Sequence, residues 1–499
     1  MDEIKLATVF SGIGAIEHAL DRINLPHKIV FACDNGDVDI LSKKIPENLL
    51  EIETELSELS KRIKKIEAQS DEDKLYKDEL DLILSKTEEE VKNYKNLNLE
   101  NSTENKIHRK IKDICQRTGM LHEKINSFRI LKELSEIKSY KEKKEYVDNL
   151  YKSKEECNKV KKTYLANYKL DNKNFHWNVA FLDGNQYKNK VDLFVGGSPC
   201  QSFSLVGKQR GLADTRGTLF YEFARLVKEI RPKVFIYENV KALLSNDKGR
   251  TWETISQVFT DLNYNWKFKV LNAKDFGIPQ NRERIFVVGF RSDLKLKKEF
   301  VFPMPIKLKR KMQDFLIDNA PGGYFLPEKG VDFVTDEKNI SKRYTQIDGE
   351  IQLCQKKNQQ YNWHGDFVFQ SEDDAKKKIK IDLEKYFLSE KVRKYVLSTG
   401  TKNFYSKPKT DLDVARPLLT TMHKMHRAGV DNYVTTDGRL RKLTPRECFR
   451  LMGFSDSFII PVSDTSAYQQ AGNSIVVDVL IHILNKVLES FPMLEGNEK

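Results

Sequence analysis

The chain has 499 residues, of which 39% are hydrophobic and 32% are charged, and its formal net charge is +12. This length allows two or three domains, each with its own core. The positive charge favours a polyanionic partner, but charge alone does not distinguish DNA from RNA or from a membrane surface.

Cysteine usage and the N-terminus indicate the compartment. The six cysteines are scattered, without a CxxC pair or a metal-like spacing, which excludes a disulfide framework and indicates reduced thiols. The first residues lack a basic stretch before an apolar core, and no run of about 18 apolar residues occurs. We therefore expect a cytoplasmic protein with no membrane partner.

The N-terminal segment predicts a strand, a turn, a helix and a second strand. Residues 6–10 (LATVF) are apolar and β-prone, and they lead into SGIGAIEHAL, a glycine turn that opens a helix. Residues 28–35 (KIVFACDN) form a strand that ends in an acid, Asp34. This order predicts a Rossmann-like βαβ unit, although Asp34 alone is also typical of a helix cap.

Residues 43–167 interrupt this pattern. Lys, Glu, Leu and Ile dominate there, and no proline follows Pro46. Six apolar residues recur every three or four positions: Leu49, Ile52, Leu56, Leu59, Ile63 and Ile66. This spacing predicts a coiled coil with a first helix over 43–69. We interpret the segment as a spacer arm, or as an arm for a protein partner or for self-association.

The alternation of strands and helices then resumes. Strand-like runs lie at 191–195, 233–237, 266–271 and 285–290, and helical patterns lie at 219–230 and 251–262. Such alternation predicts a mainly parallel sheet covered by helices. The order weakens over 303–414, which we interpret as a separate and less regular domain, and helical periodicity returns after residue 415.

Several short motifs carry the chemistry only when they are taken together. Singly, the glycine turn FSGIG, the carboxylate of YENV and the arginines of QNRER are all common in structural roles. In order, FSGIG, GGSPCQSFS, DTRGTLF, ENV, NAKDFGIPQNRER, RECFRLMGF and GNSIVV resemble the motifs of the cytosine-C5 DNA methyltransferases. The resemblance is strongest to the bacterial HhaI type and covers about 1–40, 179–303 and 415–490.

The resemblance implies an α/β fold. It consists of a Rossmann-like S-adenosylmethionine-dependent methyltransferase domain, a long helical coiled-coil insertion and a smaller irregular target-recognition domain. The expected boundaries are 1–42, 168–302 and 415–499 for the catalytic domain, 43–167 for the coiled coil and 303–414 for the recognition domain.

The resemblance also implies the catalytic groups. Cytosine C5 is a poor nucleophile until a thiolate adds at C6, and Cys200 is the expected nucleophile. Glu238 would donate a proton to N3, and Arg284 would stabilise the charge at O2. Arg282 would help to shape the pocket. The base that removes the C5 proton is not identified, and bound water is an alternative.

S-adenosylmethionine is the implied methyl donor, with S-adenosylhomocysteine as the product. Asp34 would bind the ribose hydroxyls and Asp183 the adenine amine. The family usually has a bulky residue after the ribose acid, where this chain has Asn35. The expected cofactor-binding residues are Phe10, Ser11, Gly12, Ile13, Gly14, Asp34, Asp183, Gly197, Pro199, Leu219, Asn473 and Ser474.

Double-stranded DNA is the implied partner, and the base must be flipped out of the duplex to reach a thiol. Residues 201–218 have the composition of a mobile loop. The expected DNA-binding residues are Gln201, Ser204, Lys208, Arg210 and Arg216. His423 and His426 form an HxxH pair without a third ligand, so we expect no metal site.

Two other functions stay open at this point. One branch of the family methylates cytosine in transfer RNA with the same catalytic set. A catalytically inactive DNA-binding or scaffold protein built around the coiled coil is the second alternative. The presence of Cys200, Glu238 and Arg284 favours an active enzyme, acting in restriction–modification or self-protection.

Overall fold

The structure is a computed structural model in which the chain forms two compact units. Unit 1 contains Met1–Arg310, Arg416–His423 and Met452–Lys499, and unit 2 contains Lys311–Ala415 and Lys424–Leu451. Residues 424–451, which the sequence assigned to the catalytic domain, therefore cluster with the expected recognition domain. The described residues are 3–95, 104–199, 219–317, 326, 328–342, 344–347, 363, 365–367, 383–398, 400–401, 404–405, 408–423, 426, 429–436 and 438–493.

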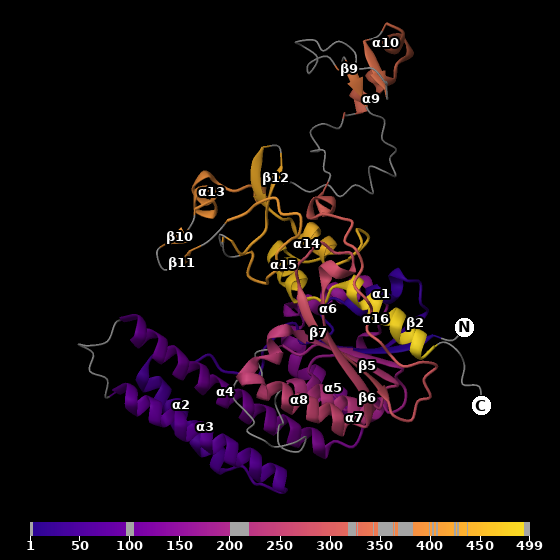
Figure 1. Ribbon diagram of the computed structural model, residues 1–499. Coiled ribbons are helices and arrows are strands. Elements are labelled where there is room, and N and C mark those ends of the chain that lie inside the picture. Colours follow the sequence, from indigo (N-terminus) through magenta and orange to yellow (C-terminus); the bar gives the residue numbers. More distant parts are fainter. Residues whose placement is uncertain are drawn as a thin grey trace. The chain divides into compact units, whose positions relative to one another are not determined.

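Unit 1 is built on a seven-stranded sheet with the order β3-β2-β1-β4-β5-β7-β6 (Figure 1). Neighbouring strands run parallel except at β7, which is antiparallel to both β5 and β6. The predicted α/β fold with a mainly parallel sheet is thus confirmed. The strands are β1 (Ile4–Val9), β2 (His27–Cys33), β3 (Phe175–His176), β4 (Leu193–Gly196), β5 (Val234–Val240), β6 (Tyr264–Asn272) and β7 (Glu283–Arg291).

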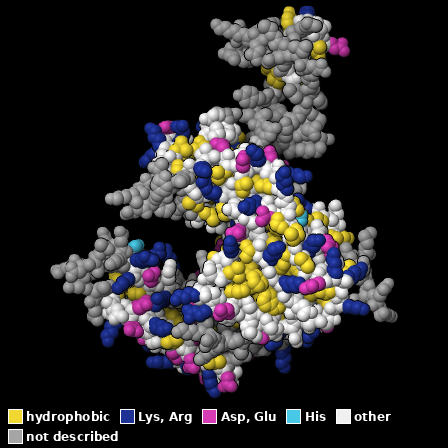
Figure 2. All heavy atoms as spheres, viewed as in Figure 1, with side chains coloured by type: hydrophobic (Ala, Val, Ile, Leu, Met, Phe, Trp, Pro, Cys, Tyr) yellow, Lys and Arg dark blue, Asp and Glu magenta, His cyan; other side chains and the backbone are white. Residues whose placement is uncertain are grey.

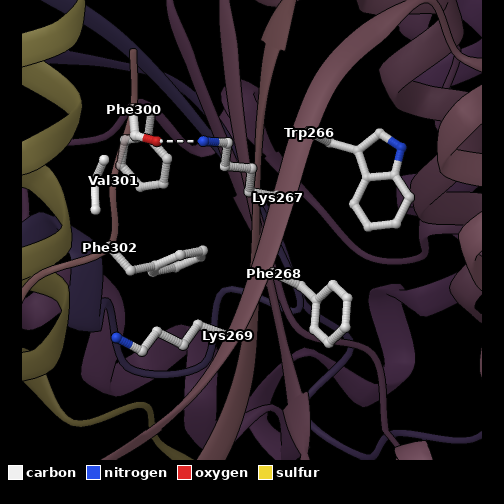
Figure 3. A pocket seen from close by; sticks show the side chains of 7 residues that line it. All are labelled: Trp266, Lys267, Phe268, Lys269, Phe300, Val301 and Phe302. Atoms are coloured by element: carbon white, nitrogen blue, oxygen red, sulfur yellow. Dashed lines mark hydrogen bonds between the residues drawn. The ribbon is translucent and has the colours of Figure 1, made fainter.

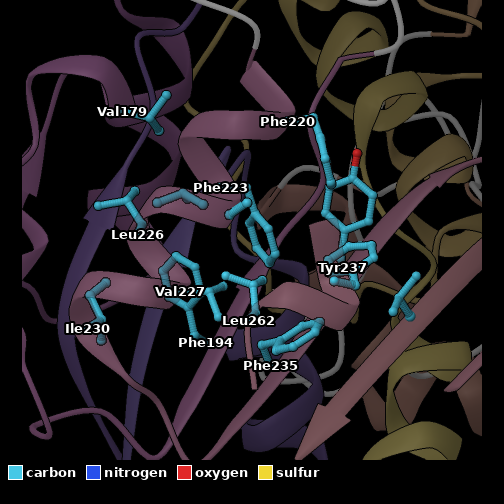
Figure 4. Packing of buried hydrophobic residues seen from close by; sticks show 14 of the residues in the cluster. Val179, Phe194, Phe220, Phe223, Leu226, Val227, Ile230, Phe235, Tyr237 and Leu262 are labelled. Atoms are coloured by element: carbon cyan, nitrogen blue, oxygen red, sulfur yellow. The ribbon is translucent and has the colours of Figure 1, made fainter. Parts of the chain in front are cut away.

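Helices pack on this sheet through an aromatic core. Helices α7 (Leu219–Ile230) and α8 (Arg250–Asp261) supply many of its side chains. Figure 4 shows Phe220 and Phe223 of α7 beside Phe235 and Tyr237 of β5. All four are fully buried, because β4 and β5 are covered on both faces and have no solvent-facing alternation.

The C-terminal helices complete unit 1. Helix α16 (Val477–Ser490) packs against α1 (Ala15–Arg22), and α15 (Asp464–Asn473) precedes it. Among the described residues, Asp464–Ser490 is the one segment long and apolar enough to cross a membrane by composition. It is interrupted at residues 474–476, and α16 buries its apolar residues inside unit 1, as a core helix does.

Residues 37–157 form a helical insertion in unit 1. Helices α2, α3 and α4 lie side by side (Figure 1) and share an apolar core to which Ile52, Leu80 and Ile125 contribute. The bounds are α2 (Leu49–Lys64), α3 (Asp71–Lys95), α4 (Glu104–Glu136) and α5 (Tyr140–Tyr151). The predicted helix over 43–69 is therefore wrong at both ends. Its start is set by Asn48, whose side chain accepts a hydrogen bond from the Leu50 N–H.

A second apolar cluster joins the insertion to the sheet. The C-terminal part of α4 and α5 contact Trp177 and Phe181, which follow β3. Tyr151 of α5 stacks on Trp177 with 4.8 Å between ring centroids and 6° between planes. The proximal part of the insertion is thus packed into the body of unit 1.

Helix α6 (Lys159–Asn167) belongs to the body of unit 1 by its contacts. Its Tyr164 hydroxyl donates to Glu17 Oε1 of α1 at 2.6 Å, and its Thr163 hydroxyl donates to Gln470 Oε1 of α15 at 3.0 Å. The expected end of the insertion at residue 167 therefore lies about one helix too late in the chain.

The edge strand β6 borders a groove of about 480 Å³ (Figure 3). It is lined by Trp266–Lys269 and by residues 300–302. Lys267 Nζ donates to the Phe300 carbonyl at 2.9 Å across this groove. None of these residues was expected in the active site.

Unit 2 includes a buried ion pair. Arg441 of β13 (Arg439–Lys442) makes two 2.8 Å bonds to Glu447 of α14 (Pro445–Leu451), and both side chains are at most 1% exposed. The further elements described there are α9 (Glu328–Thr335), α10 (Glu337–Ser341), α13 (Glu390–Val396), β8 (Thr345–Ile347), β9 (Gly365–Phe367), β10 (Gly400–Thr401), β11 (Phe404–Tyr405) and β12 (Tyr433–Thr436).

Candidate active site

The turn after β1 carries the first group of expected cofactor residues. Phe10, Gly12 and Gly14 all have positive φ angles, of 52°, 54° and 81°. A Cβ at Gly14 would lie 2.1 Å from the ring of Tyr168, whose hydroxyl donates to the Gly14 carbonyl at 2.7 Å. Only glycine fits this position, because both the backbone angle and the ring exclude a side chain.

The acid at the end of β2 lies beside this turn. Asp34 Oδ2 accepts a hydrogen bond from the Gly12 N–H, and Oδ1 accepts one from the Gly36 N–H, both at 2.8 Å. Burial raises the pKa of Asp34, and the two N–H donors oppose that shift. A carboxylate offers about four acceptor positions, so two backbone donors leave room for two hydroxyls of a ligand.

Strand β4 ends close to β5. A Cβ at Gly197 would lie 2.9 Å from Glu238 Oε2, so this glycine permits the close approach. Two hydrogen bonds fix the following residue, Ser198. Its hydroxyl lies 2.7 Å from the Tyr237 hydroxyl, and the Asn239 amide donates to its carbonyl at 2.9 Å. Pro199 comes next and is described, whereas Cys200 lies outside the described residues.

Glu238 and Arg284 come together inside the sheet. Strand β5 extends to Val240, beyond the predicted end at residue 237, and β7 pairs with it so that Arg284 lies opposite Val240. Arg284 Nε lies 3.0 Å from Glu238 Oε1, and the two side chains are 21% and 12% exposed. Glu238 is therefore neither an ordinary edge carboxylate nor half of a surface ion pair.

The electrostatics of Glu238 favour a carboxyl that can hold a proton. Burial raises the pKa of Glu238, while Arg284 and Arg282 act in the opposite direction. Burial dominates because a carboxylate loses more hydration energy than the nearby arginines return. A group in this state can donate a proton to a basic ring nitrogen.

Arg282 was expected among the catalytic residues, but its hydrogen bonds are to backbone carbonyls. Its guanidinium is buried and donates to the carbonyls of Gly472 and Ser474 at 2.9 Å, and to that of Leu418 at 3.3 Å. Burial lowers the pKa of Arg282 to about 9. Arg282 thus holds three carbonyls of two backbone segments, 418 and 472–474, and we describe it as a positioning residue.

The same connection between β6 and β7 holds another residue that the sequence did not single out. Gln280 is fully buried, and its Oε1 accepts a hydrogen bond from the Leu418 N–H at 3.2 Å. A Cβ at Gly472 would lie 2.6 Å from the Thr420 nitrogen. The QNRER motif therefore anchors residues 416–423 as well as supplying Arg284.

Asn473 and Ser474 end α15, and Ser474 joins the site through its carbonyl bond with Arg282. Leu219 begins α7 and packs against the aromatic core. Ile13, in the glycine turn, is 2% exposed. Ser11 is bonded to the end of β2, because its hydroxyl accepts from the Cys33 N–H at 3.0 Å.

Asp183 does not lie with these residues. It caps a short 3-10 turn, pairs with Lys143 of α5 at 3.3 Å, and precedes Gly184, whose N–H donates to Glu229 in the last turn of α7. The C-terminal end of α7 leads to the start of β5, so this contact is away from the carboxyl ends of the strands. The described contacts of Asp183 and Gly184 are therefore with α5 and α7, and the placement of Asp183 beside adenine stays a prediction.

Asn178 is a polar residue near the carboxyl end of the edge strand β3. Asn178 comes two residues after the end of β3, and the Asp34 N–H donates to the β3 carbonyl of His176 at 3.0 Å. Asn178 Oδ1 accepts from the Ala180 N–H at 2.9 Å. Its position after a strand is the feature by which the sequence could have indicated it as a site residue, but β3 is only two residues long and was not predicted.

The structure does not describe the expected DNA-binding residues. Gln201, Ser204, Lys208, Arg210 and Arg216 lie outside the described residues. His423 Nδ1 lies 2.8 Å from the Thr420 carbonyl. Within the described ranges, no group of three or more His, Cys, Asp or Glu side chains could hold a metal ion.

Fold and site together define a class of protein. A parallel-rich α/β sheet with a glycine turn and an acid at the carboxyl ends of its first two strands is a Rossmann-like arrangement. Next to it, at the ends of β4 and β5, lie Pro199 and the half-buried Glu238–Arg284 pair. This combination is consistent with a methyltransferase.

Comparison with known proteins identifies the family. Residues 142–489 match the family model of the C-5 cytosine-specific DNA methylases. The chain is 34% identical over 347 residues to the type II methyltransferase M.SsoII of Shigella sonnei, over 66% of this chain and 72% of the relative. It is 35% identical over 299 residues to M.HhaI of Haemophilus parahaemolyticus, over 58% of this chain and 74% of the relative.

The chain therefore belongs to the C-5 cytosine-specific DNA methylase family. It is a DNA (cytosine-5-)-methyltransferase, in a family whose transferases use S-adenosylmethionine. The crystal structure of the S. pombe Dnmt2 methyltransferase superposes with a TM-score of 0.50 at 14% identity, over 98% of this chain and 99% of that one. At this identity the superposition shows the fold alone.

Proposed function

We propose that the chain methylates a cytosine that it flips out of duplex DNA, with Cys200 as the nucleophile, in restriction–modification or self-protection. The observation that carries the proposal is the Glu238–Arg284 pair, with 3.0 Å between Arg284 Nε and Glu238 Oε1. Glu238 of this pair lies close to Gly197, which is three residues before Cys200 in the chain. The names of M.SsoII and M.HhaI as type II methyltransferases support the restriction–modification role.

The described residues support covalent catalysis at C6. The Cys200 thiolate would form an S–C6 bond, and the electron pair of the 5,6 double bond would move to C5 while charge develops at N3 and O2. The Glu238 carboxyl would donate its proton to N3, and Arg284 would stabilise both the resulting carboxylate and O2. C5 would then use its electron pair to bond the methyl group that S-adenosylmethionine supplies. A base would next remove the C5 proton, and the C–H electron pair would restore the 5,6 double bond and expel the Cys200 thiolate. No described residue is assigned as this base.

The residues at the ends of β1 and β2 fit S-adenosylmethionine. Gly12 and Gly14 leave the turn without side chains, and Asp34 retains acceptor positions for vicinal hydroxyls. When bound, this group supplies an electrophilic methyl on a sulfonium. Asn473 and Ser474 would complete the wall, and Arg282 holds this turn through the carbonyls of Gly472 and Ser474.

DNA binding is proposed for residues 201–218 and for the recognition domain. Flipping costs a few kcal/mol, which backbone contacts of Lys208, Arg210 and Arg216 would offset. Basic and acidic side chains are mixed on the viewed face of the insertion (Figure 2). Acidic residues outnumber basic ones over residues 49–95, so this part lacks the positive charge that the DNA backbone selects. A spacer or partner-binding arm fits it better.

A substrate comparison tests the proposal. Methyl transfer from labelled S-adenosylmethionine is measured on duplex DNA and on transfer RNA, with wild type and with Cys200→Ser. We expect transfer to DNA by wild type alone, and cofactor binding by both proteins. Activity on transfer RNA only would refute the DNA substrate, and undiminished activity of Cys200→Ser would refute the nucleophile.

A trapping experiment tests the covalent step separately. In duplex DNA with 5-fluorocytosine at the target, fluorine at C5 cannot leave as a proton does, so the S–C6 bond persists after methyl transfer. We expect a denaturation-resistant protein–DNA adduct that depends on Cys200. Its absence under conditions that support turnover of normal DNA would contradict attack at C6.

A further inference from the structure

The helical insertion leaves the catalytic body and returns to it at one place. Gly36 is the last residue before it, and Asn158 is the first residue after it. A Cβ at Gly36 would lie 2.1 Å from Asn158 Oδ1, and Gly36 has a φ angle of 58°. The two ends of the insertion are therefore in contact, and glycine is needed at the first of them.

The side chain of Asn158 bonds in two directions at this junction. Its Oδ1 accepts a hydrogen bond from the Lys161 N–H at 2.8 Å, which caps helix α6. Its Nδ2 donates to the backbone carbonyl of Asp34 at 3.0 Å. Asn158 is 2% exposed, so water does not compete well for either bond.

The bond to Asp34 acts on the acid that faces the glycine turn. Asp34 is held through its own N–H, which donates to His176, and through its carboxylate, which accepts from Gly12 and Gly36. The Asn158 amide holds the remaining polar group of that residue, its carbonyl. Rotation of this peptide unit would displace the residues that follow it, including the Gly36 N–H that holds Asp34 Oδ1.

We propose that Asn158 is a positioning residue for cofactor binding: its amide ties the returning end of the insertion to the Asp34 carbonyl and so fixes the orientation of the Asp34 carboxylate. This inference rests on the proposed function, because it assigns Asp34 to S-adenosylmethionine. It also explains how an insertion of this size is accommodated directly after the cofactor acid: the chain re-enters through a residue that re-anchors that acid.

Helix capping by Asn158 is separable from the tie to Asp34. Serine is also a good N-cap residue, but its side chain is too short to reach the Asp34 carbonyl as well. Asn158→Ser therefore keeps the bond to Lys161 and removes the tie. Asn158→Asp keeps the capping oxygen and replaces the amide donor, and it serves as a second variant if the first one is poorly folded.

The chain offers a matched control in the same insertion. Asn48 caps α2 by accepting a hydrogen bond from the Leu50 N–H at 2.9 Å, and no bond to the cofactor turn is involved. Asn48→Ser makes the same chemical change at the other end of the insertion. An effect that is specific to the tie must be absent in this variant.

The test is calorimetric binding of S-adenosylhomocysteine, followed by steady-state methylation of duplex DNA. We expect Asn158→Ser to bind about 5-fold more weakly, the ratio for one net hydrogen bond. The KM for S-adenosylmethionine should rise by a similar factor, while kcat and the KM for DNA stay unchanged. Asn48→Ser should match wild type in every readout.

The outcomes separate the two levels of inference. If wild type does not bind S-adenosylhomocysteine, the proposed function fails. If wild type binds and both Asn158 variants bind equally well, the positioning role is wrong. If the Asn158 variants lose kcat and raise both KM values together, or if Asn48→Ser shows the same loss, the effect is general destabilisation, which also overturns the inference.

Discussion

Replacing Arg282 by Met separates positioning from catalysis in the QNRER motif. Arg282 makes two bonds of 2.9 Å and one of 3.3 Å to backbone carbonyls, all from a buried guanidinium. Each of the shorter charge-assisted bonds contributes about 1.5 kcal/mol. The two shorter bonds together give about 3 kcal/mol. Methionine also removes the desolvation cost of the charge, which we take to offset the loss of the weaker 3.3 Å bond, so the expected net loss is about 3 kcal/mol.

This loss should be local. Unfolding of a chain with two units is not a two-state process, so a global melting curve does not report it. Hydrogen exchange measured by mass spectrometry does: peptides that cover 416–423 and 470–476 should exchange about 100-fold faster in Arg282→Met, from about 1.4 kcal/mol per tenfold change. Peptides from β1 and β4 should be unchanged.

Arg284→Met is the matched control, with the same substitution two residues away. Arg284 contacts Glu238 and the Glu283 carbonyl, so we expect kcat to fall by about 100-fold with normal exchange at 416–423 and 470–476. Normal exchange in Arg282→Met, together with a kcat as low as that of Arg284→Met, would refute the positioning role and restore Arg282 as a catalytic residue.

Glu238 and the helical insertion give three further predictions. Burial raises the pKa of Glu238, so its proton is present at low pH and is lost as pH rises through that value; kcat should fall on the alkaline side. Glu238→Gln should lower kcat by about 100-fold and abolish this alkaline fall, and a profile identical in shape to wild type would contradict proton donation by Glu238. Deleting 47–114 and joining Pro46 to Cys115 through a short Gly-Ser linker should retain methylation, because the Cys115 thiol lies 3.4 Å from the Pro46 carbonyl. Deleting 44–165 should abolish cofactor binding, because it removes Asn158 and Tyr164. Calorimetry with S-adenosylhomocysteine on both deletion variants checks this. Binding by the variant that lacks 44–165 would show that the contact between Asn158 and Asp34 is dispensable.

The sequence by itself predicts most of the local structure of the catalytic body. Predominantly apolar runs predict β1, β4 and β7, because strands that are buried on both faces show no alternation. Helical periodicity predicts α7 at its observed bounds. Motif order also led to the family that the comparisons show. These features depend on short stretches of chain, which carry their own periodicity and turn residues.

Only the tertiary structure decided which distant residues meet. The pairing of β5 with β7 puts Arg284 against Glu238, and the same connection turns Arg282 towards Gly472 and Ser474 instead. Alternate residues of a strand point to opposite faces of the sheet, which the sequence predicts. The residues that each of these side chains contacts come from distant parts of the chain, which the sequence does not predict.

The same limit applies to Asp183 and to the end of the insertion. Asp183 was matched to a motif by its type, yet the fold carries it past the short β3 to the end of α7. The end of the insertion could not be read from composition, because α6 is as polar as the helices before it and is distinguished only by its contacts with Glu17 and Gln470. Periodicity determines that a segment is a helix, whereas burial against a particular neighbour determines to which body that helix belongs.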